Sequence, residues 1–234
     1  MSNIRIIPVT TRKGLRAFVN FYYELYKGNK FAVPFLRFDE MNTLSKRKNP
    51  AFEFCEAQYF LAVNHEARIV GRVAAIINRR ANEQWNKKQV RFGWFDFVDD
   101  LEVSQALLNA VEAWGRTKGM TECVGPLGFT DMDREGLLIE GFHHKSTMYI
   151  NYNYPYYKNH MEAMSFYEKD NDWLEYRIKV PEETPAKFAR TAEMIKKRYN
   201  LHVHKFTSRE LVKGGMGREV FHIVNETYKD LYDF

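Results

Sequence analysis

The sequence predicts an α/β fold, in which helices flank a mixed central sheet, and two observations support this. Residues 90–98 are rich in Phe, Trp and Val, which favours a buried strand. Residues 101–118 then repeat apolar side chains at helical spacing, and 121–124 are expected to form a second short strand. Strand, helix and strand in this order form a crossover unit, so the two strands should lie parallel. A hairpin-length connection at 64–68, between two other apolar runs, predicts an antiparallel pair as well.

Apolar periodicity and turn residues define the other elements. Pro8 places the first strand at an edge of the sheet or ends it early, and Gly119 ends the central helix as a C′ glycine does. Either Asp99 or Asp100 can cap that helix at its N-terminus. The expected strands are 4–9, 58–63, 69–77, 90–98, 121–124, 137–140, 147–152, 173–180 and 201–206. The expected helical segments are 13–26, 39–45, 101–118, 153–164, 186–199 and one that includes 211–228, and 79–88 is either a loop or a short helix.

A change in composition at 180–185, where two prolines and two glutamates occur, predicts a linker. We therefore expect one domain at 1–181 and a C-terminal extension of strand and helix at 182–234. The extension is either part of a second module of the same type or a helical cap on the first domain. The sequence leaves both interpretations open.

Composition excludes several classes of protein. The 234 residues are 45% hydrophobic, which is ample for a folded core. No apolar run is long enough to span a bilayer, and the first residues lack the apolar region of a signal peptide. The two cysteines, Cys55 and Cys123, form neither a metal-binding spacing nor a disulfide framework. We expect a cytoplasmic protein without a membrane span.

The charge pattern does not by itself identify a binding partner. The formal net charge is +5, and two short basic clusters, 46–48 and 196–198, are typical of solvated faces. Basic and aromatic residues do not alternate on one face, so a nucleic-acid partner is not expected. The adjacent His143 and His144 have no partner at i+4 and no cysteine nearby, so no metal site is expected. A phosphate-bearing cofactor is compatible with the weak positive charge.

Several motifs resemble the GNAT acyltransferase superfamily over roughly residues 4–180. Residues 107–119, which open with two leucines and close on a basic residue and a glycine, resemble the helix after the central strand of that superfamily. Tyr157 lies in a segment that resembles the late helix, although Ser165 replaces its usual glycine. The shorter motifs at 125–126, 133–138, 140–142, 152–157 and 172–173 resemble a poorly characterised bacterial branch whose members continue into a second GNAT-like half.

This resemblance implies a GNAT-like fold and an acyl-CoA-dependent N-acyltransferase. The donor would be acetyl-CoA or another acyl-CoA, and the acceptor would be a small-molecule amine; a homodimer is left open. In the late helix, Tyr157 would protonate the departing thiolate. The cofactor would bind at the end of the central strand and the first turn of the next helix. The residues implied there are Phe97, Val98, Val103, Ser104 and Gln105.

The sequence departs from the superfamily where that cofactor should bind. The usual pyrophosphate loop has a basic residue and two small residues, because Gly lets a phosphate approach backbone N–H groups at a helix N-terminus. Here the matching positions hold Asp99, Glu102 and Ser104, and Asp100 adds a further carboxylate. Carboxylates stabilise a helix N-terminus but repel a pyrophosphate. The alternative function is therefore a non-catalytic GNAT-like module that binds a ligand or supports structure, with no catalysis in this half.

Asp96 is the candidate general base. It lies between Phe95 and Phe97 in the central strand, so its side chain points away from theirs. Apolar neighbours can raise the pKa of such a carboxyl group and suit it to take a proton from an amine. The alternative is a structural Asp bonded to loop backbone. For Tyr157, and for its neighbours Tyr154 and Tyr156, the alternative is aromatic packing.

Overall fold

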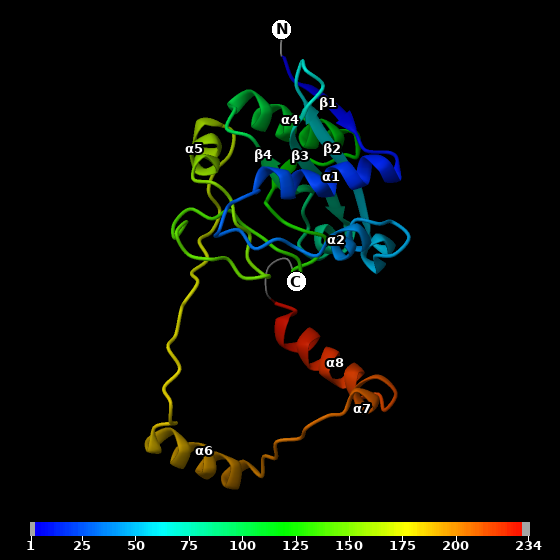
Figure 1. Ribbon diagram of the computed structural model, residues 1–234. Coiled ribbons are helices and arrows are strands. Elements are labelled where there is room, and N and C mark those ends of the chain that lie inside the picture. Colours follow the sequence, from blue (N-terminus) through cyan, green and yellow to red (C-terminus); the bar gives the residue numbers. More distant parts are fainter. Residues whose placement is uncertain (1–2, 231–234) are drawn as a thin grey trace. The chain divides into compact units, whose positions relative to one another are not determined.

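The computed structural model describes residues 3–230, which divide into two compact units, 3–170 and 171–230. The first unit contains a five-stranded sheet in the order β1-β2-β3-β4-β5 (Figure 1). Neighbouring strands are antiparallel except β4 and β5, which are parallel. The predicted mixed sheet is confirmed, and β1 lies at its edge. The strands are β1 (Arg5–Pro8), β2 (Cys55–Val63), β3 (Ile69–Asn78), β4 (Gln89–Phe97) and β5 (Glu122–Val124).

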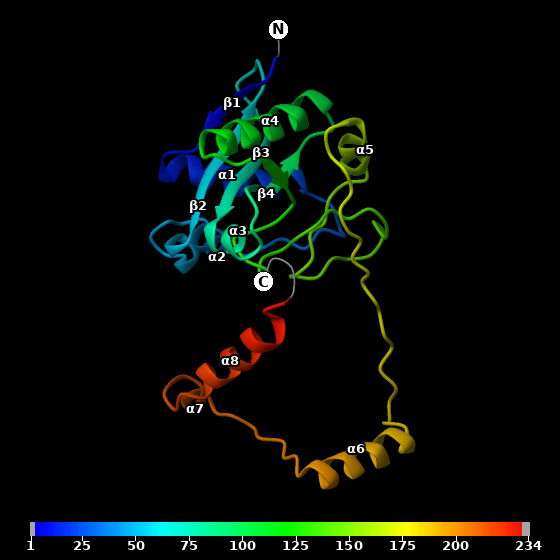
Figure 2. The ribbon, with the colours of Figure 1, turned by 180° about the vertical axis from the view of Figure 1, so that it is seen from behind.

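Helices cover both faces of this sheet, so the unit has three layers. The opposite views of Figures 1 and 2 show α1 (Arg12–Leu25) on one face and α4 (Leu101–Thr117) on the other. On the α1 face lie α2 (Arg37–Thr43) and the 3-10 turn η1 (Pro50–Glu53), and α5 (Tyr156–Ala163) contributes to the α4 face. The remaining helix, α3 (Arg79–Gln84), joins β3 to β4.

Each face of the sheet carries its own apolar core, because alternate strand residues point to opposite sides. On the α4 face, Val90, Phe92 and Phe97 of β4 pack with Leu107 of α4. On the α1 face, Phe18 belongs to a second cluster of buried side chains. Both cores rest on amphipathic helices of the kind that the sequence predicted for 13–26 and 101–118.

A bulge in β4 decides where its polar residues point. Arg72 of β3 pairs with Asp96 and Ala74 pairs with Gly93, so two residues of β4 oppose one residue of β3. Trp94, inside the bulge, has a positive φ of 45°. Because one inserted residue reverses the alternation of side chains, the bulge moves Asp96 from the α4 face to the α1 face. That is the face on which Arg72 lies.

Close packing leaves room only for a glycine at position 93, beside this bulge. A Cβ atom at Gly93 would lie 2.4 Å from the carbonyl oxygen of Leu127. The backbone of Leu127 also donates a hydrogen bond to Phe92 O at 2.8 Å. The segment after β5 therefore continues alongside β4 and brings residues 126–136 to the end of the sheet.

Four predicted strands are absent from the described residues. Residues 137–140 and 147–152 form loops, which the Asn153 side chain ties together by bonding both the N–H and the carbonyl of Leu138, at 2.7 and 3.0 Å. Residues 173–180 and 201–206 are exposed and lie beside no strand within 171–230. A strand needs a neighbour to satisfy its backbone groups, so apolar alternation alone did not suffice there.

The second unit contains helices but no strand within 171–230. The prediction of a C-terminal extension made of strand and helix is therefore wrong about the strand. Its helices are α6 (Ala186–Tyr199), α7 (Ser208–Val212) and α8 (Met216–Tyr228), and none of their residues is buried. That residues 182–234 begin a second module or cap stays a prediction. Among residues 3–230, none of the helices combines the length and the apolar character needed to cross a bilayer.

Candidate functional site

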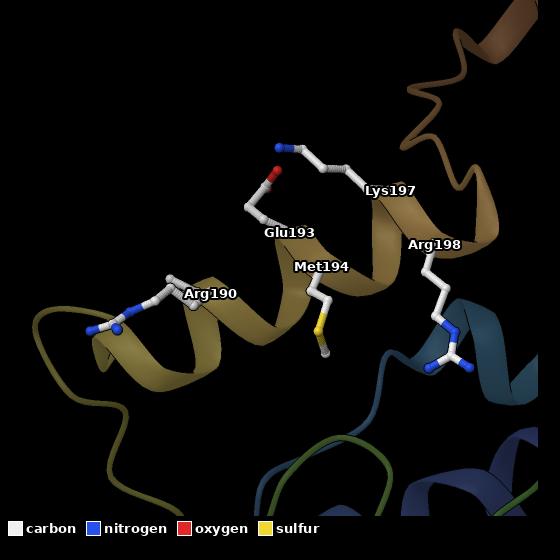
Figure 3. A pocket seen from close by; sticks show the side chains of 6 residues that line it. Arg190, Glu193, Met194, Lys197 and Arg198 are labelled. Atoms are coloured by element: carbon white, nitrogen blue, oxygen red, sulfur yellow. The ribbon is translucent and has the colours of Figure 1, made fainter.

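Two hollows of the described residues differ in how many elements line them. The first is lined by six exposed residues of α6 alone, five of which are labelled in Figure 3. A single helix surface offers no enclosing wall to a ligand. The second hollow is a cavity of about 200 Å³ in the first unit. It is lined by residues from α1, α2, β3, β4 and the segment 126–153, and Asp96 is among them.

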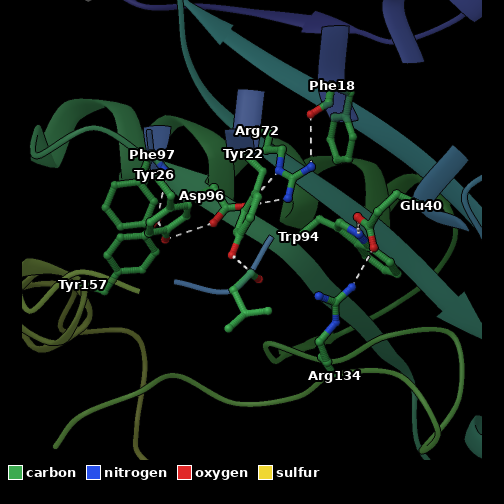
Figure 4. A network of polar contacts seen from close by, with 11 residues as sticks. Phe18, Tyr22, Tyr26, Glu40, Arg72, Trp94, Asp96, Phe97, Arg134 and Tyr157 are labelled. Atoms are coloured by element: carbon green, nitrogen blue, oxygen red, sulfur yellow. Dashed lines mark hydrogen bonds and ion pairs between the residues drawn. The ribbon is translucent and has the colours of Figure 1, made fainter. Parts of the chain in front are cut away.

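Asp96 forms a buried ion pair with Arg72 in the wall of this cavity. Both Nε and Nη2 of Arg72 lie 2.7 Å from Oδ2 of Asp96, and the Arg72 side chain is only 1% exposed (Figure 4). A third nitrogen of Arg72 donates to the carbonyl of Phe18 at 3.1 Å. The other carboxylate oxygen, Oδ1, accepts one bond from the Tyr26 hydroxyl at 3.3 Å. The partners of Asp96 are therefore side chains, and not the loop backbone of the structural alternative.

A second buried ion pair lies in the same wall. Glu40, in the first turn of α2, accepts a bond from Arg134 at 2.6 Å on Oε1 and from the indole of Trp94 at 2.8 Å on Oε2. The first turn of a helix favours a carboxylate because the helix dipole is positive there. The Arg134 guanidinium also lies over the ring of Phe35. This cluster ties α2, the β4 bulge and the segment 126–153 together.

Tyr157 is fully buried behind the cavity rather than in its wall. Its hydroxyl accepts a bond from the Phe97 N–H at 3.1 Å and shares a hydrogen bond of 3.1 Å with the Tyr26 hydroxyl. Burial, and secondly the charge of Asp96, raise the pKa of Tyr157 well above its usual value. Asp96, Tyr26 and Tyr157 thus form a continuous chain of hydrogen bonds from the cavity to the end of β4 (Figure 4).

The residues expected to hold the cofactor lie together, but most of their polar groups have partners within the chain. The Phe97 carbonyl accepts a bond of 2.5 Å from the Tyr156 hydroxyl, and its N–H is bonded to Tyr157. Val98 donates to the carbonyl of Val70 at 3.0 Å. Val103 and Ser104 are buried and Gln105 is exposed.

The N-terminus of α4 is likewise occupied by side chains of this chain. Asp100 is the N-cap residue and accepts a bond from Glu102 N at 2.9 Å. His160 of α5 lies 2.9 Å from Asp99 Oδ1 through Nε2 and 2.9 Å from the Ser104 hydroxyl through Nδ1. His160 therefore links Asp99 and Ser104, two positions of the segment where the resemblance put the pyrophosphate loop.

Sequence reasoning identified Asp96 but missed its partners. Arg72 carried a signal, because an arginine inside an otherwise apolar strand is rarely buried without a counter-charge. The roles of Glu40, Arg134 and Tyr26 depend on how distant segments meet, and no local pattern marks them. Among residues 3–230, no group of three or more His, Cys, Asp or Glu side chains is placed to hold a metal ion.

Comparisons with known proteins give two curated relatives, and no family model matches. The chain is 32% identical over 157 residues to Protein YghO of Escherichia coli, covering 67% of this chain and 40% of that protein. It is 28% identical over 177 residues to Bacterial ceramide synthase of Caulobacter vibrioides, covering 75% of this chain and 46% of that protein. The chain thus spans less than half the length of either relative.

Two solved structures are also similar at 15% identity. One is a GNAT-family acetyltransferase from Staphylococcus aureus, with a TM-score of 0.35 over 50% of this chain and 69% of that one. The other is assigned as an acetyl transferase of Pyrococcus furiosus, with a TM-score of 0.39 over 74% of this chain and 100% of that one. TM-scores of this size do not support a conclusion about function. By its own element order and its parallel crossover, the first unit is an α/β domain with a mixed central sheet, as the sequence predicted.

Proposed function

We propose that this chain takes part in N-acyl transfer, in which an acyl group moves from an acyl-CoA thioester to a primary amine. The observation that carries the proposal is the buried Asp96 carboxylate in the wall of a cavity that several elements line. The amine nitrogen would attack the thioester carbonyl, form the amide bond and lose one proton. Asp96 would accept that proton, and the released CoA thiolate would take one through the hydrogen-bond chain that links Asp96, Tyr26 and Tyr157.

The hydrogen-bond chain supports this division of roles. Tyr26 lies 3.3 Å from Asp96 and 3.1 Å from Tyr157, so a proton can pass between the two ends without crossing open solvent. Tyr157 keeps its proton at neutral pH, as an ordinary tyrosine does, and burial raises its pKa further, which makes it a weaker acid. A protonated phenol next to the end of β4 is the form that an acid needs.

The acceptor is proposed to be a long-chain amine with a polar head. A ceramide, the product named for the relative from Caulobacter vibrioides, is an amide of a long-chain amino alcohol. In this chain the cavity wall holds four carboxylates and two guanidinium groups, so its balance of charge favours a cationic head. Around the cavity lie three exposed apolar side chains that suit an alkyl tail, namely Met132, Met148 and Tyr149.

A transfer assay tests this proposal. The chain is incubated with acetyl-CoA or palmitoyl-CoA and a long-chain amine, and the amide is measured by mass spectrometry. Asp96→Asn should reduce amide formation by about 100-fold or more, because a positioned base typically contributes that much. Asp170→Asn, which changes an exposed carboxylate outside the cavity, is the matched control. Equal rates for the two variants would show that Asp96 is not the base.

The second candidate function is that of a non-catalytic GNAT-like module, which binds the acyl acceptor but not the acyl donor. The specific observation in its favour is that the peptide groups of Phe97 are bonded to Tyr156 and Tyr157. Calorimetric titration separates the two candidates, since the second predicts binding of the amine and none of acyl-CoA. The double variant Asp99→Arg with Glu102→Gly should then restore acyl-CoA binding if charge and bulk alone block it.

Both cysteines support the proposal of a reducing, cytoplasmic compartment. Cys55 and Cys123 are free thiols. Burial raises the pKa of Cys55 to about 12 and that of Cys123 to about 11, so neither is a ready thiolate nucleophile. A homodimer stays a prediction, which sedimentation of the purified chain would test.

A further inference from the structure

Helix α6 of the second unit exposes a continuous apolar stripe. Its members recur at intervals of four, three and four residues, which places them on one face of the helix over about three turns; they are Phe188, Ala192, Ile195 and Tyr199. Phe188 is 66% exposed and Tyr199 is 61% exposed. A helix that gathers its apolar residues on one face ordinarily buries that face against something else. The stripe is therefore a candidate docking surface.

The rest of α6 is strongly basic. The helix holds five basic residues and one acidic residue, Glu193, which leaves a net charge of +4. The whole chain has a formal net charge of +5, so the residues outside α6 are together almost neutral. Figure 3 shows three of the cations, Arg190, Lys197 and Arg198, as long side chains that extend away from the helix. The net charge of the chain is thus concentrated beside the stripe.

Basic residues border the stripe on both sides. Lys187 directly precedes Phe188, which places it about 100° around the helix on one side. Lys196 directly follows Ile195, so it lies by the same angle on the other side, where it also pairs with Glu193 at 2.8 Å. Long basic side chains at such an edge lay their methylene groups along the apolar face and keep their charge in water. This arrangement is typical of helices that lie in the interface of a lipid bilayer.

Helix α8 shows that exposed apolar residues alone do not select this partner. Its Phe221 is 65% exposed, almost as much as Phe188. However, α8 holds one basic residue, Arg218, against two acidic residues, Glu219 and Glu226. Of the two helices, only α6 joins an apolar stripe to an excess of positive charge. An anionic lipid surface attracts such a helix through both properties.

We propose that α6 is a peripheral anchor that docks on the surface of an anionic lipid bilayer. The stripe enters the boundary between head groups and acyl chains, and the bordering cations contact the negatively charged head groups. The helix has 14 residues and one apolar face, so it lies along the surface, whereas a span needs about 20 predominantly apolar residues. The stripe lies outside the cavity, and the proposal does not depend on the proposed transfer.

Co-sedimentation of the full chain with lipid vesicles tests the proposal. One set of vesicles is phosphatidylcholine alone, and the other contains phosphatidylcholine and phosphatidylglycerol in equal parts. The chain should bind the anionic vesicles about tenfold more tightly or better, because each cation near such a surface strengthens binding about fivefold. Equal affinity for the two sets, or binding to neither, would overturn the proposal, and this comparison needs no variant.

A double variant tests the role of the charge. Lys187→Gln with Arg198→Gln removes two cations from α6 and leaves the stripe intact, so binding to the anionic vesicles should weaken by about 25-fold. The matched control is Lys46→Gln with Arg47→Gln, which removes the same charges from the exposed basic cluster of the first unit. The control should bind as the unaltered chain does. An equal loss in the control would show that net charge and not α6 attracts the lipid, and would overturn the proposal.

A single variant tests the role of the stripe. Phe188→Ala leaves every charge in place and should weaken binding to the anionic vesicles by about tenfold or more, because one large ring no longer leaves water. Phe221→Ala on α8 is the matched control, since the two rings are almost equally exposed, and it should leave binding unchanged. No loss in Phe188→Ala, or the same loss in Phe221→Ala, would overturn the proposal. The vesicles contain no acyl donor, so a chain that binds them and forms no amide would refute only the proposed transfer.

Discussion

Replacement of Arg72 by Met tests whether the buried ion pair is a structural requirement of the site. The variant removes two 2.7 Å bonds to Asp96 and one 3.1 Å bond to Phe18 O. Asp96 would keep only its 3.3 Å contact with Tyr26, so an almost uncompensated charge would remain buried. Loss of one partner of such a pair typically lowers the free energy of unfolding by about 3–5 kcal/mol. That is a large part of the roughly 5–15 kcal/mol available to a domain.

A double-mutant cycle gives this prediction its sharpest form. Asp96→Asn alone should also destabilise, because it leaves the Arg72 guanidinium buried without its counter-charge. The double variant should lose less than the sum of the two, by about 2 kcal/mol or more, since neither charge is then stranded. Urea unfolding followed by circular dichroism measures these differences. At a slope of about 2 kcal/mol per molar, Arg72→Met should lower the urea midpoint by about 2 M.

An exposed pair provides the control for the cycle. Arg68 and Glu66 form an ion pair of 3.2 Å in which the side chains are 77% and 49% exposed. Such pairs contribute about 0–1 kcal/mol, so Arg68→Met should scarcely move the midpoint. Additive losses at Arg72 and Asp96, or a loss of under about 1 kcal/mol for Arg72→Met, would refute the account of this pair.

Three further predictions concern the surrounding framework. Tyr157→Phe leaves the buried N–H of Phe97 unsatisfied, so urea unfolding should show a loss of about 1–3 kcal/mol; an unchanged midpoint would contradict this. Burial raises the pKa of Asp133 above 3.8 in the folded protein, so the contribution of Asp133 to the free energy of unfolding should fall as pH rises from 3.8 through that raised pKa. In a series of urea unfolding experiments at different pH, Asp133→Asn should remove this fall. A steeper fall in the variant would contradict the prediction. Gly93→Ala places a Cβ 2.4 Å from Leu127 O and should lower the free energy of unfolding by about 1–3 kcal/mol, whereas a stabilised variant would refute the close packing.

The sheet was predictable wherever apolar periodicity coincides with a neighbouring strand. The expected strands at 69–77 and 90–98 correspond to β3 and β4, and the helix at 186–199 corresponds to α6. The same alternation at 173–180 gave a strand that the described residues do not contain, because no neighbour satisfies its backbone. Local sequence specifies side-chain pattern but not the presence of a partner.

The site was predictable only in part, for the same reason. The polar position of Asp96 between two phenylalanines was visible in the sequence, but the bulge that points it at Arg72 was not. The Glu40–Arg134 pair joins residues that lie far apart in the chain, so no spacing rule reveals it. The carboxylates at the start of α4 were visible, whereas the bridge from His160 to Asp99 depends on the packing of α5.

Formation of an amide by the chain is the measurement that tests the central claim most directly. Purified protein, palmitoyl-CoA and 2-amino-1-octanol are combined, and the amide and free CoA are quantified together by mass spectrometry. The proposed function predicts equal amounts of the two products, and a loss of about 100-fold or more in Asp96→Asn. Amide formation no faster than in a protein-free control would contradict N-acyl transfer by this chain.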